Sequence, residues 1–331
     1  MDKILILGGT NFIGRNLVDR LIQLDNFDIT LFNRGKSNPD LYPAIRELHG
    51  DRNTSEINII FKEKWDYIID LSCYFPDSLS HIVSHLDKSI KRYIFISTCS
   101  VYDNDLDKSI LRDENSPTLN CAEKEKTDTF VATYGKRKAE CERILIQSDL
   151  RYSIFRPALV YGSFDSTDRF YYWLYQIKKG NQLLIPNRGE NLFSVTYVKD
   201  LIQVIIKSLK VDFHSDTYNV TTYPDLSISK LIDIISQLLD KHPDLYFADT
   251  VFLNENKIAQ WTDLPLWLDC DYFTYDNTKI LKDLEIEITD FKDSVSDTIN
   301  YYDKLDWKEP IYGLSEKTKN KLIKKITTAN T

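Results

Sequence analysis

The sequence predicts an α/β protein in which a doubly wound parallel sheet is accompanied by a smaller, discontinuous C-terminal lobe. Up to about residue 160, short apolar runs alternate with segments whose apolar residues recur at helical spacing. Strands that alternate with helices form right-handed crossovers, which place a parallel sheet between two helix layers. With 331 residues, 42% of them hydrophobic, the chain can bury such a core without disulfides.

The elements follow in order from these patterns. In the first half, we expect strands at residues 3–7, 28–32, 45–49, 67–71, 92–97 and 152–155, and helices at 13–24, 54–63, 75–86 and 134–147. Further along, helices are predicted at 168–179, 198–209 and 228–239, with strands near 183–185 and 217–220. Residues 103–133 are too many and too polar for an ordinary connection, and residues 240–290 are expected to be irregular.

Charge and composition exclude several classes of protein. Forty-two Lys and Arg against fifty Asp and Glu give a net charge of −8, which is unfavourable for general nucleic-acid binding. The Lys-rich end from residue 315 is interpreted as a solvated terminal helix. No apolar run approaches the ~20 residues that span a bilayer, and no secretory signal pattern is seen, so we expect a cytoplasmic protein. The five cysteines lack metal-ligand spacing, and we expect free thiols and no metal site.

A glycine-containing turn follows the first predicted strand, where residues 4–14 read ILILGGTNFIG. Glycines allow a tight turn and let the backbone approach a pyrophosphate, which faces the amides at the helix start. The turn therefore predicts dinucleotide binding, with contacts from Gly8, Thr10, Asn11, Phe12, Ile13 and Gly14. Asn11 replaces the usual middle glycine, and we expect it to adopt a left-handed backbone, which Asn tolerates better than most residues. A tight turn without a ligand is the alternative.

The end of the second predicted strand bears on the type of cofactor. An acidic residue there binds the ribose hydroxyls of NAD, whereas Arg suits the 2′-phosphate of NADP. The chain has Asn33 followed by Arg34, which favours NADP without excluding NAD; Arg34 as a plain surface charge is the alternative. Asp51 is predicted either to contact the adenine or to cap a strand end, and Leu71 is placed in the same cofactor site.

Tyr134 and Lys138 stand four residues apart, on one face of a predicted helix. A free Tyr titrates near pH 10, and a neighbouring ammonium lowers that pKa. Such a pair exchanges a proton with a substrate hydroxyl while hydride moves to or from nicotinamide. A chance match on an amphipathic helix is the alternative. The predicted helix follows the fifth strand, whose carboxyl end is where an open α/β sheet binds ligands.

With these features, residues 1–240 of the chain resemble the extended and atypical short-chain dehydrogenases/reductases. This group is the NAD-dependent epimerase/dehydratase family. The resemblance includes RPALVYG at residues 156–162 and VKDL at residues 198–201. It implies a Rossmann-type fold and a triad of Thr98, Tyr134 and Lys138. In that triad Tyr134 is the acid/base, Lys138 holds the nicotinamide ribose, and Thr98 bonds the reacting oxygen.

Two departures refine the resemblance. Cys99 and Ser100 stand where sugar-nucleotide 4,6-dehydratases carry acidic residues, which disfavours dehydration. Asn11 and residues 33–35 are similar to the branch of the chloroplast stem-loop-binding proteins, some of whose members bind RNA.

The sequence thus predicts an NAD(P)-dependent oxidoreductase or epimerase that acts on a hydroxyl or ketone carbon of a nucleotide sugar. Residues 1–160 are assigned to the NAD(P)-binding domain, with returns near 190–220, and residues 161–331 mostly to the substrate lobe and C-terminal helices. Arg169 or Arg188 could clamp a diphosphate, or serve as a helix cap or surface ion pair. A homodimer is a family expectation. The alternative is an RNA-binding or nucleotide-sensing protein that retains this fold.

Overall fold

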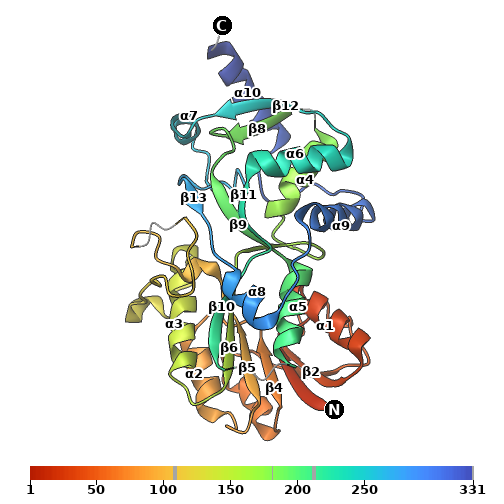
Figure 1. Cartoon of the computed structure of the whole chain (residues 1–331), viewed down its shortest axis with the longest axis vertical. Helices are drawn as coiled ribbons and strands as arrows, with labels where there is room; N and C mark the ends of the chain where they lie inside the picture. The colour runs from red at the N-terminus through yellow and green to blue at the C-terminus, as the bar shows by residue number, and fades with distance from the viewer. Residues whose placement is uncertain (107–109, 181, 211–213, 330–331) are drawn as a thin grey trace. The chain divides into compact units, whose positions relative to one another are not determined.

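A seven-stranded parallel sheet forms the centre of the first of two units in the computed structural model, which describes residues 1–106, 110–180, 182–210 and 214–329. In spatial order its strands are β10 (Asp216–Val220), β6 (Tyr152–Pro157), β5 (Arg92–Ile96), β4 (Tyr67–Asp70), β1 (Asp2–Leu7), β2 (Phe27–Asn33) and β3 (Arg46–His49). Helices α1 (Phe12–Leu24) and α5 (Val198–Ser208) pack together on one face, and α2 (Pro76–His85) and α3 (Tyr134–Ile146) on the other (Figure 1). The predicted doubly wound α/β fold is confirmed.

The first unit comprises residues Met1–Val160, Val198–Thr221 and Tyr275–Ile288. Its sheet order reverses between β1 and β4, which are neighbours although they are not consecutive along the chain. In open α/β sheets, ligands bind at the carboxyl ends of the strands beside such a reversal. The segments that follow β1, β4 and β5 therefore define the candidate site.

An apolar core fixes the helices of the α2–α3 face to this sheet. Inward-facing residues of the central strands are fully buried because the apolar runs predicted as strands lie between two helix layers. Burial of each such Leu, Ile or Phe side chain contributes about 1.5–3 kcal/mol. The core residues of the strands and the two helices include Leu5, Leu7, Ile68, Phe95, Ile154, Leu79, Ile82, Cys141 and Leu145.

The segment predicted as a helix at residues 54–63 is a 3-10 helix, η1 (Ser55–Lys62). Its two buried residues, Ile57 and Ile60, are three apart. Because a 3-10 helix has three residues per turn, both side chains face the sheet. Thr54 caps the element by accepting a hydrogen bond from the Glu56 amide.

The helical elements of the long polar segment between β5 and α3 are short turns in its described residues. These are η2 (Cys99–Val101), η3 (Glu123–Glu125) and η4 (Val131–Thr133). The unit is completed by α8 (Thr278–Leu284), which contacts β10 and α5.

The second unit comprises Tyr161–Tyr197, Thr222–Thr274 and Thr289–Thr331, and β7 (Leu159–Tyr161) ends at its first residue. In one of its sheets β9 (Leu192–Tyr197) pairs antiparallel with β11 (Tyr223–Ser227) and parallel with β13 (Tyr272–Phe273). In the other, β8 (Gln182–Pro186) pairs parallel with β12 (Asp244–Ala248). The helices are α4 (Arg169–Lys179), α6 (Ile228–Leu239), α7 (Thr250–Glu255), α9 (Phe291–Asp303) and α10 (Glu316–Ala329). The assignment of cofactor binding to residues 1–160 and substrate binding to residues 161–331 stays a prediction.

The prediction that residues 240–290 are irregular was wrong, because β12, α7, β13 and α8 lie within this range. Strand β12 was not predicted because its sequence, DLYFA, mixes acidic and aromatic residues without clear alternation. In the structure this segment forms a strand by pairing with β8. Helices α7 and α8 have six and seven residues. Such short segments carry too little periodicity to stand out.

Helix α10 differs from the predicted solvated terminal helix. Leu322 and Ile323 are buried, and Lys319 is only 1% exposed. The Lys319 ammonium donates to Gln176 Oε1 at 2.6 Å and to Glu316 Oε1 at 2.7 Å. One side of α10 therefore packs against the rest of the second unit, and Lys319 has a structural role there.

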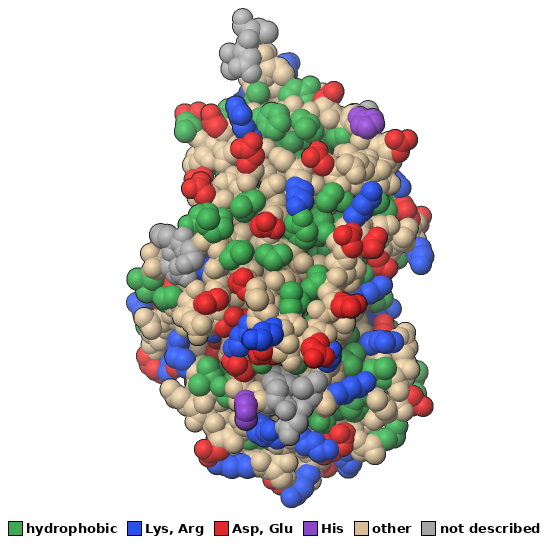
Figure 2. All heavy atoms as spheres, viewed as in Figure 1, with side chains coloured by type: hydrophobic (Ala, Val, Ile, Leu, Met, Phe, Trp, Pro, Cys, Tyr) green, Lys and Arg blue, Asp and Glu red, His purple; other side chains and the backbone are tan. Residues whose placement is uncertain are grey.

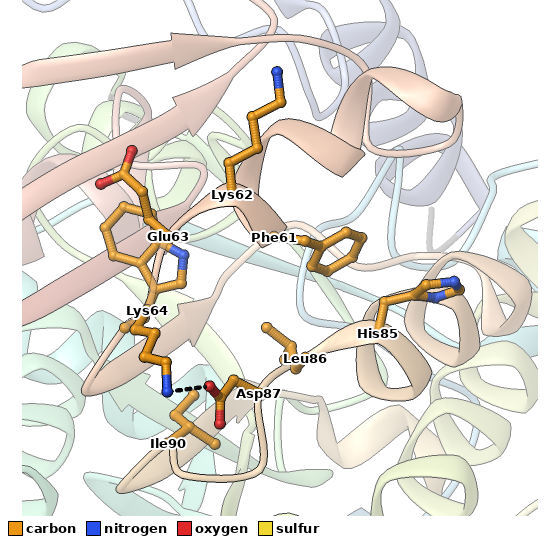
Figure 3. Close-up of a pocket in the computed structure, with 9 residues that line it drawn as sticks. Phe61, Lys62, Glu63, Lys64, His85, Leu86, Asp87 and Ile90 are labelled. Carbon is orange, nitrogen blue, oxygen red and sulfur yellow. Dashed lines mark ion pairs between the residues drawn. The ribbon is translucent and has the colours of Figure 1, made fainter.

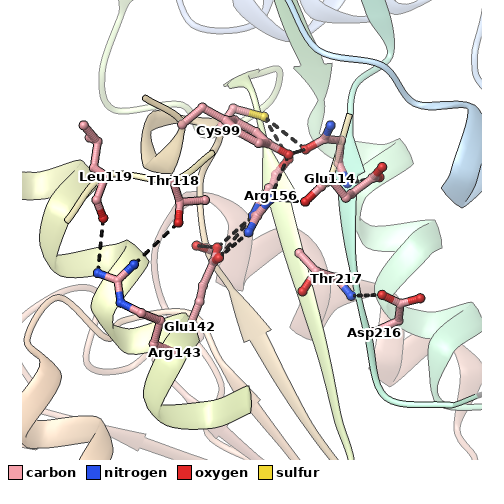
Figure 4. Close-up of polar contacts among 12 residues, drawn as sticks. Cys99, Glu114, Thr118, Leu119, Glu142, Arg143, Arg156, Asp216 and Thr217 are labelled. Atoms are coloured by element: carbon pink, nitrogen blue, oxygen red, sulfur yellow. Dashed lines mark hydrogen bonds and ion pairs between the residues drawn. The ribbon is translucent and has the colours of Figure 1, made fainter. Parts of the chain in front are cut away.

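A buried ion pair anchors α3 to the sheet. Arg156 on β6 contacts Glu142 on α3, with Nη2–Oε2 at 2.6 Å and Nε–Oε1 at 3.0 Å (Figure 4). Glu142 also accepts a 2.5 Å hydrogen bond from Ser97 Oγ, and Arg156 Nη1 donates to the Tyr102 hydroxyl at 2.8 Å. The Tyr102 hydroxyl donates in turn to Asn219 Oδ1 on β10 at 2.6 Å. These bonds connect α3, β5, β6 and β10 through fully buried polar groups.

Replacing one partner of this pair should be strongly destabilising. Glu142→Leu leaves the Arg156 guanidinium buried without its counter-ion, and we expect the free energy of unfolding to fall by about 3–5 kcal/mol. The double variant Glu142→Leu/Arg156→Met removes both charges, so its loss should be smaller than the sum of the single losses. Urea unfolding followed by Trp fluorescence measures both. Additive losses would contradict the coupling.

Asp165, in the second unit, is buried although it carries a carboxyl group. Its Oδ1 accepts hydrogen bonds from the amide and the hydroxyl of Thr167, both at 2.8 Å. Burial raises the pKa of Asp165 to about 6, while these bonds act in the opposite direction. Because the folded-state pKa lies above the unfolded one, the folded protein retains this proton more strongly, and the group destabilises the fold as pH rises from about 4 to 6.

Asp165→Asn should therefore stabilise the protein above pH 6. The amide oxygen can accept the same hydrogen bonds but never becomes charged. We expect the variant to gain up to about 3 kcal/mol of unfolding free energy over the wild type between pH 4 and pH 7.5. Chemical denaturation at both pH values measures the gain, and a difference that does not change with pH would contradict it.

Candidate active site

The turn after β1 has the geometry of a phosphate-binding turn. Gly8 and Gly9 have φ values of 113° and 114°, a region that favours glycine. A Cβ on Gly14 would lie 2.6 Å from the Gly9 Cα, so only glycine allows α1 to approach the end of β1 this closely. The backbone thus presents the first amides of α1 at the carboxyl edge of the sheet, where they favour an anion.

The expectation of a left-handed backbone at Asn11 was wrong. Asn11 is extended, with φ −135° and ψ 152°, and the positive φ falls on the next residue, Phe12. Because any side chain accepts an extended backbone, Asn replaces glycine here without strain. The Asn11 side chain is exposed beside the turn, whereas Thr10 is buried and Ile13 half-buried.

At the end of β2, Asn33 has a structural role. Its Oδ1 accepts from the Gly35 amide at 2.7 Å, and its Nδ2 donates to Glu47 Oε2 at 3.2 Å. Arg34, by contrast, is exposed. Glu47 had no signal in the sequence, because only the pairing of β2 with β3 brings its carboxylate to this position.

Asp51 follows β3 and Leu71 follows β4, two strands that β1 and β2 separate in the sheet. Asp51 Oδ1 accepts from the Asn53 amide at 2.9 Å, and the Asp51 amide donates to Glu56 Oε2 at 2.8 Å. These bonds agree with the strand-end cap that was one of the two interpretations of Asp51. Leu71 lies beside the phosphate turn, with its Cβ 3.4 Å from where a Cβ on Gly8 would be.

A second buried ion pair, which the sequence did not reveal, holds the loop after β4. Arg52 and Asp70 form a bidentate contact at 2.5 and 2.9 Å, and the Tyr93 hydroxyl donates to Asp70 at 2.6 Å. Asp70 also accepts from the Ser72 amide at 3.1 Å, and Arg52 Nε donates to Ser78 Oγ at 3.0 Å. Burial would raise the pKa of Asp70, but the charge and hydrogen bonds of Arg52 hold it below its ordinary value.

Thr98 and Tyr134 meet at the carboxyl end of β5. Thr98 caps η2 by accepting from the Ser100 amide at 3.1 Å, and Tyr134 is the first residue of α3. Thr98 is close enough to Tyr134 to lower the pKa of its phenol. Gly135 makes this contact possible, since a Cβ there would lie 2.1 Å from the Ser100 carbonyl oxygen. The helix can therefore begin directly against η2.

Lys138 lies one turn further along α3 and is 2% exposed. Its ammonium donates to the carbonyl oxygens of Ile96, at 2.7 Å, and Cys73, at 3.0 Å. It also lies 3.9 Å from the centroid of the Phe95 ring, a cation–π contact. Lys138 thus joins the carboxyl ends of β4 and β5, and burial lowers its pKa.

The electrostatics of Tyr134 differ from the expectation that Lys138 lowers its pKa. Burial raises the pKa of Tyr134, and the nearby Tyr74 phenol, whose ring centroid is 6.1 Å away, acts in the same direction. Thr98 lowers the pKa of Tyr134 and only partly offsets these effects. The Lys138 ammonium is directed to backbone carbonyls. Because the pKa of Tyr134 is raised, the phenol stays protonated at neutral pH.

The two arginines predicted to contact substrate lie in the second unit. The Arg169 guanidinium lies 4.4 Å from the centroid of the Tyr312 ring and 5.8 Å from that of Trp261. Arg188 is exposed in the turn between β8 and β9, where its carbonyl oxygen accepts from Ser229 Oγ at 2.7 Å. Arg169 is thus packed between aromatic rings, whereas Arg188 is open to solvent.

Pockets lie in the described part of the first unit both at the carboxyl ends of its strands and at the opposite ends. A pocket of about 550 Å³ near the carboxyl ends of β3 and β4 is lined by residues that include Arg52, Phe75, Ser78 and Lys126. The other, of about 370 Å³, lies where the chain enters β4 and β5; Phe61, His85 and the Lys64–Asp87 ion pair surround it (Figure 3). In the described part of the chain, no three His, Cys, Asp or Glu side chains gather as metal ligands. None of the described helices has the length and hydropathy needed to cross a bilayer.

Comparison with known proteins agrees with this geometry. A relative from Arabidopsis thaliana, the chloroplast stem-loop binding protein of 41 kDa b, is 27% identical over 222 residues, which cover 62% of this chain and 55% of the relative. The chain thus matches about half the length of that protein. The dTDP-4-dehydro-6-deoxyglucose reductase of Escherichia coli is 25% identical over 292 residues, which cover 78% of this chain and 88% of the reductase.

Among solved structures, the UDP-glucuronic acid 4-epimerase from Bacillus cereus in complex with NAD has a TM-score of 0.69 and 16% identity, covering 92% of this chain and all of that one. This similarity shows the fold. The model of the NAD dependent epimerase/dehydratase family matches residues 4–221, which include the phosphate turn, the carboxyl end of β5 and the start of α3. The resemblance found in the sequence is confirmed, and the chain belongs to the NAD dependent epimerase/dehydratase family.

Proposed function

We propose that this protein is an NAD(P)-dependent oxidoreductase or epimerase that acts on a hydroxyl or ketone carbon of a nucleotide sugar. One observation carries the proposal: Thr98, Tyr134 and Lys138 gather at the same edge of the sheet as the phosphate turn. The loop after β4 links these three residues to the phosphate turn. Its Leu71 lies beside Gly8, and its Cys73 carbonyl oxygen accepts a hydrogen bond from Lys138. A protein that only binds nucleotide does not need a proton donor at this position.

The bound dinucleotide would supply or accept the hydride. The amides at the start of α1 would hold its pyrophosphate, in the cradle that Gly14 keeps open. Tyr134 carries the proton on its phenolic oxygen, because burial favours the neutral form. It would donate this proton to the carbonyl oxygen of the substrate, and Thr98 would orient that oxygen.

Elimination of water is not part of the proposal. A dehydratase needs an additional acid or base beside the triad, and Cys99 and Ser100 stand at that position. The Cys99 thiol donates to the Arg156 carbonyl oxygen at 3.1 Å. Burial raises the pKa of Cys99 well above its usual range, so the thiol stays neutral.

Both nicotinamide cofactors fit the residues at the end of β2. Arg34 is exposed and could reach a 2′-phosphate, whereas the Glu47 carboxylate, 3.2 Å from Asn33, would accept from a ribose hydroxyl and repel a phosphate. On the substrate side, Arg188 is open to pair with a diphosphate, while Arg169 is already packed against aromatic rings.

RNA binding is the competing function, because the Arabidopsis relative is named for stem-loop binding. The net charge of −8 opposes it, and Lys and Arg are interspersed with Asp and Glu on the face shown in Figure 2. Lys319 is buried and cannot contact RNA. Failure to bind NAD, NADH, NADP or NADPH in calorimetry, with salt-sensitive binding of a structured RNA, would favour this alternative.

Tyr134→Phe should lower turnover by about 10²–10⁴-fold, because the variant lacks the proton donor. Cofactor affinity should stay within a few-fold of the wild type, since the aromatic ring remains. UDP-glucuronic acid and dTDP-4-dehydro-6-deoxyglucose serve as probes, with nicotinamide absorbance and chromatography of the sugar as readouts. Tyr74→Phe is the matched control, since it removes the neighbouring hydroxyl. If Tyr134→Phe retains full turnover, Tyr134 is not the acid/base.

Arg34→Ala should weaken binding of NADP more than binding of NAD, because only NADP offers a 2′-phosphate to the guanidinium. Glu47→Gln should act in the opposite sense and improve the relative affinity for NADP. Calorimetric titration of each variant with the oxidised cofactors measures both ratios. Equal effects of Arg34→Ala on the two cofactors would show that Arg34 does not contact the 2′-phosphate.

A further inference from the structure

Two cysteine thiols lie side by side beneath the candidate site. Cys73 belongs to the loop after β4, and Cys141 lies on α3, three residues beyond Lys138. Their Sγ atoms are 3.9 Å apart, and the side chains are 1% and 0% exposed. No disulfide joins any of the five cysteines, all of which are described. The pair is therefore a buried dithiol that the proposed reaction does not use.

The charges around the two sulfurs differ. Burial would raise the pKa of Cys73, but the hydrogen bond with Cys141 and the cationic Arg52 and Lys138 outweigh it and lower the pKa. The hydrogen bond with Cys73, together with burial, raises the pKa of Cys141. Cys73 is thus the nucleophile of the pair, because the thiolate is the reactive form.

The dithiol also touches the proposed machinery. The carbonyl oxygen of Cys73 accepts a 3.0 Å hydrogen bond from the Lys138 ammonium. Tyr74, the next residue, is 50% exposed, so the loop that carries Cys73 borders solvent. A small oxidant needs only a local opening of this loop to reach the sulfur.

We infer that Cys73 and Cys141 form a reversible disulfide when a peroxide oxidises them, and that this bond weakens dinucleotide binding by displacing Lys138. The Cys73 thiolate attacks a peroxide oxygen; the O–O bond breaks, and the hydroxide that leaves becomes water on protonation. Cys141 Sγ then attacks the sulfenic Cys73 sulfur, the S–O bond breaks, and a second water leaves. Overall, two thiols and hydrogen peroxide yield one disulfide and two water molecules.

The geometry explains why the disulfide would affect the site. A disulfide requires a sulfur separation of about 2.05 Å, so the two sulfurs must approach each other by about 2 Å. Cys73 and Lys138 are joined by one hydrogen bond, and Cys141 shares a helix with Lys138. Closure therefore pulls the loop after β4 against α3 and disturbs the contact between Lys138 and Cys73. The effect on the cofactor rests on the proposed function, whereas formation of the bond does not.

The direct test uses the wild-type protein, treated with hydrogen peroxide, alkylated, digested with trypsin and analysed by mass spectrometry without reduction. We expect the peptides of residues 65–88 and 139–143 to be recovered as one linked species that dithiothreitol separates. Cys99 is the control for burial, since it is 2% exposed and donates to a backbone carbonyl instead of a second thiol. Cys270, which is exposed, reports that oxidant was present. Oxidation of Cys270 with the two peptides still unlinked would overturn the inference.

The second readout is affinity for NADH and NADPH, measured by calorimetry before oxidation, after oxidation and after reduction. We expect the better-bound cofactor to bind at least tenfold more weakly to the oxidised wild type, with recovery on reduction. Cys141→Ala should keep its affinity through the same treatment, whereas the matched variant Cys99→Ala should lose affinity as the wild type does. If the peptides are linked but the affinity for the cofactor is unchanged, the inference that the disulfide displaces Lys138 and weakens binding is overturned. A reduced protein that binds neither cofactor would refute the proposed function while the peptide result still decides the disulfide.

Discussion

The buried ion pair of Glu142 and Arg156 is the interaction on which the candidate site depends. Removing two charges from water is costly, and the cost is offset only when geometry and further hydrogen bonds are good. Ser97 and Tyr102 supply those bonds from the end of β5 and the segment after it. Because Glu142 lies one turn beyond Lys138 on α3, the pair sets where the helix lies on the sheet. Tyr134 and Lys138 reach the carboxyl edge as a consequence.

A second buried ion pair, Arg52 and Asp70, holds the loop after β4 in position on the sheet. Away from the edge, the sheet is held to its helices by apolar packing, which is largely non-directional. At the carboxyl ends of the strands, directional ion pairs and hydrogen bonds replace this apolar packing. This division is physically reasonable, because a site for a polar ligand needs backbone groups held in fixed positions, and polar contacts define such positions more sharply than apolar ones.

Burial also decides the protonation states at this edge. It raises the pKa of Tyr134 and lowers that of Lys138, so both changes disfavour charge. The proton therefore stays on the Tyr134 phenol, which is the form that donates to a carbonyl oxygen. The dithiol of Cys73 and Cys141 lies in the same region, and the cations that hold the edge together, Arg52 and Lys138, also favour the thiolate of Cys73.

The sequence by itself determined the parallel sheet and most of its helices, because buried strands are short apolar runs and amphipathic helices repeat every three to four residues. It also determined the glycine turn and the spacing of Tyr134 and Lys138, since both patterns are local. Only the tertiary structure decided the partners of Glu142, Asp70, Glu47 and Lys319, because these contacts join residues far apart in the sequence or on different strands. It also corrected Asn11, whose backbone is extended while the positive φ falls on Phe12, and Tyr134, whose pKa depends on burial. Burial and long-range pairing are properties of the fold, and a local pattern of residues does not contain them.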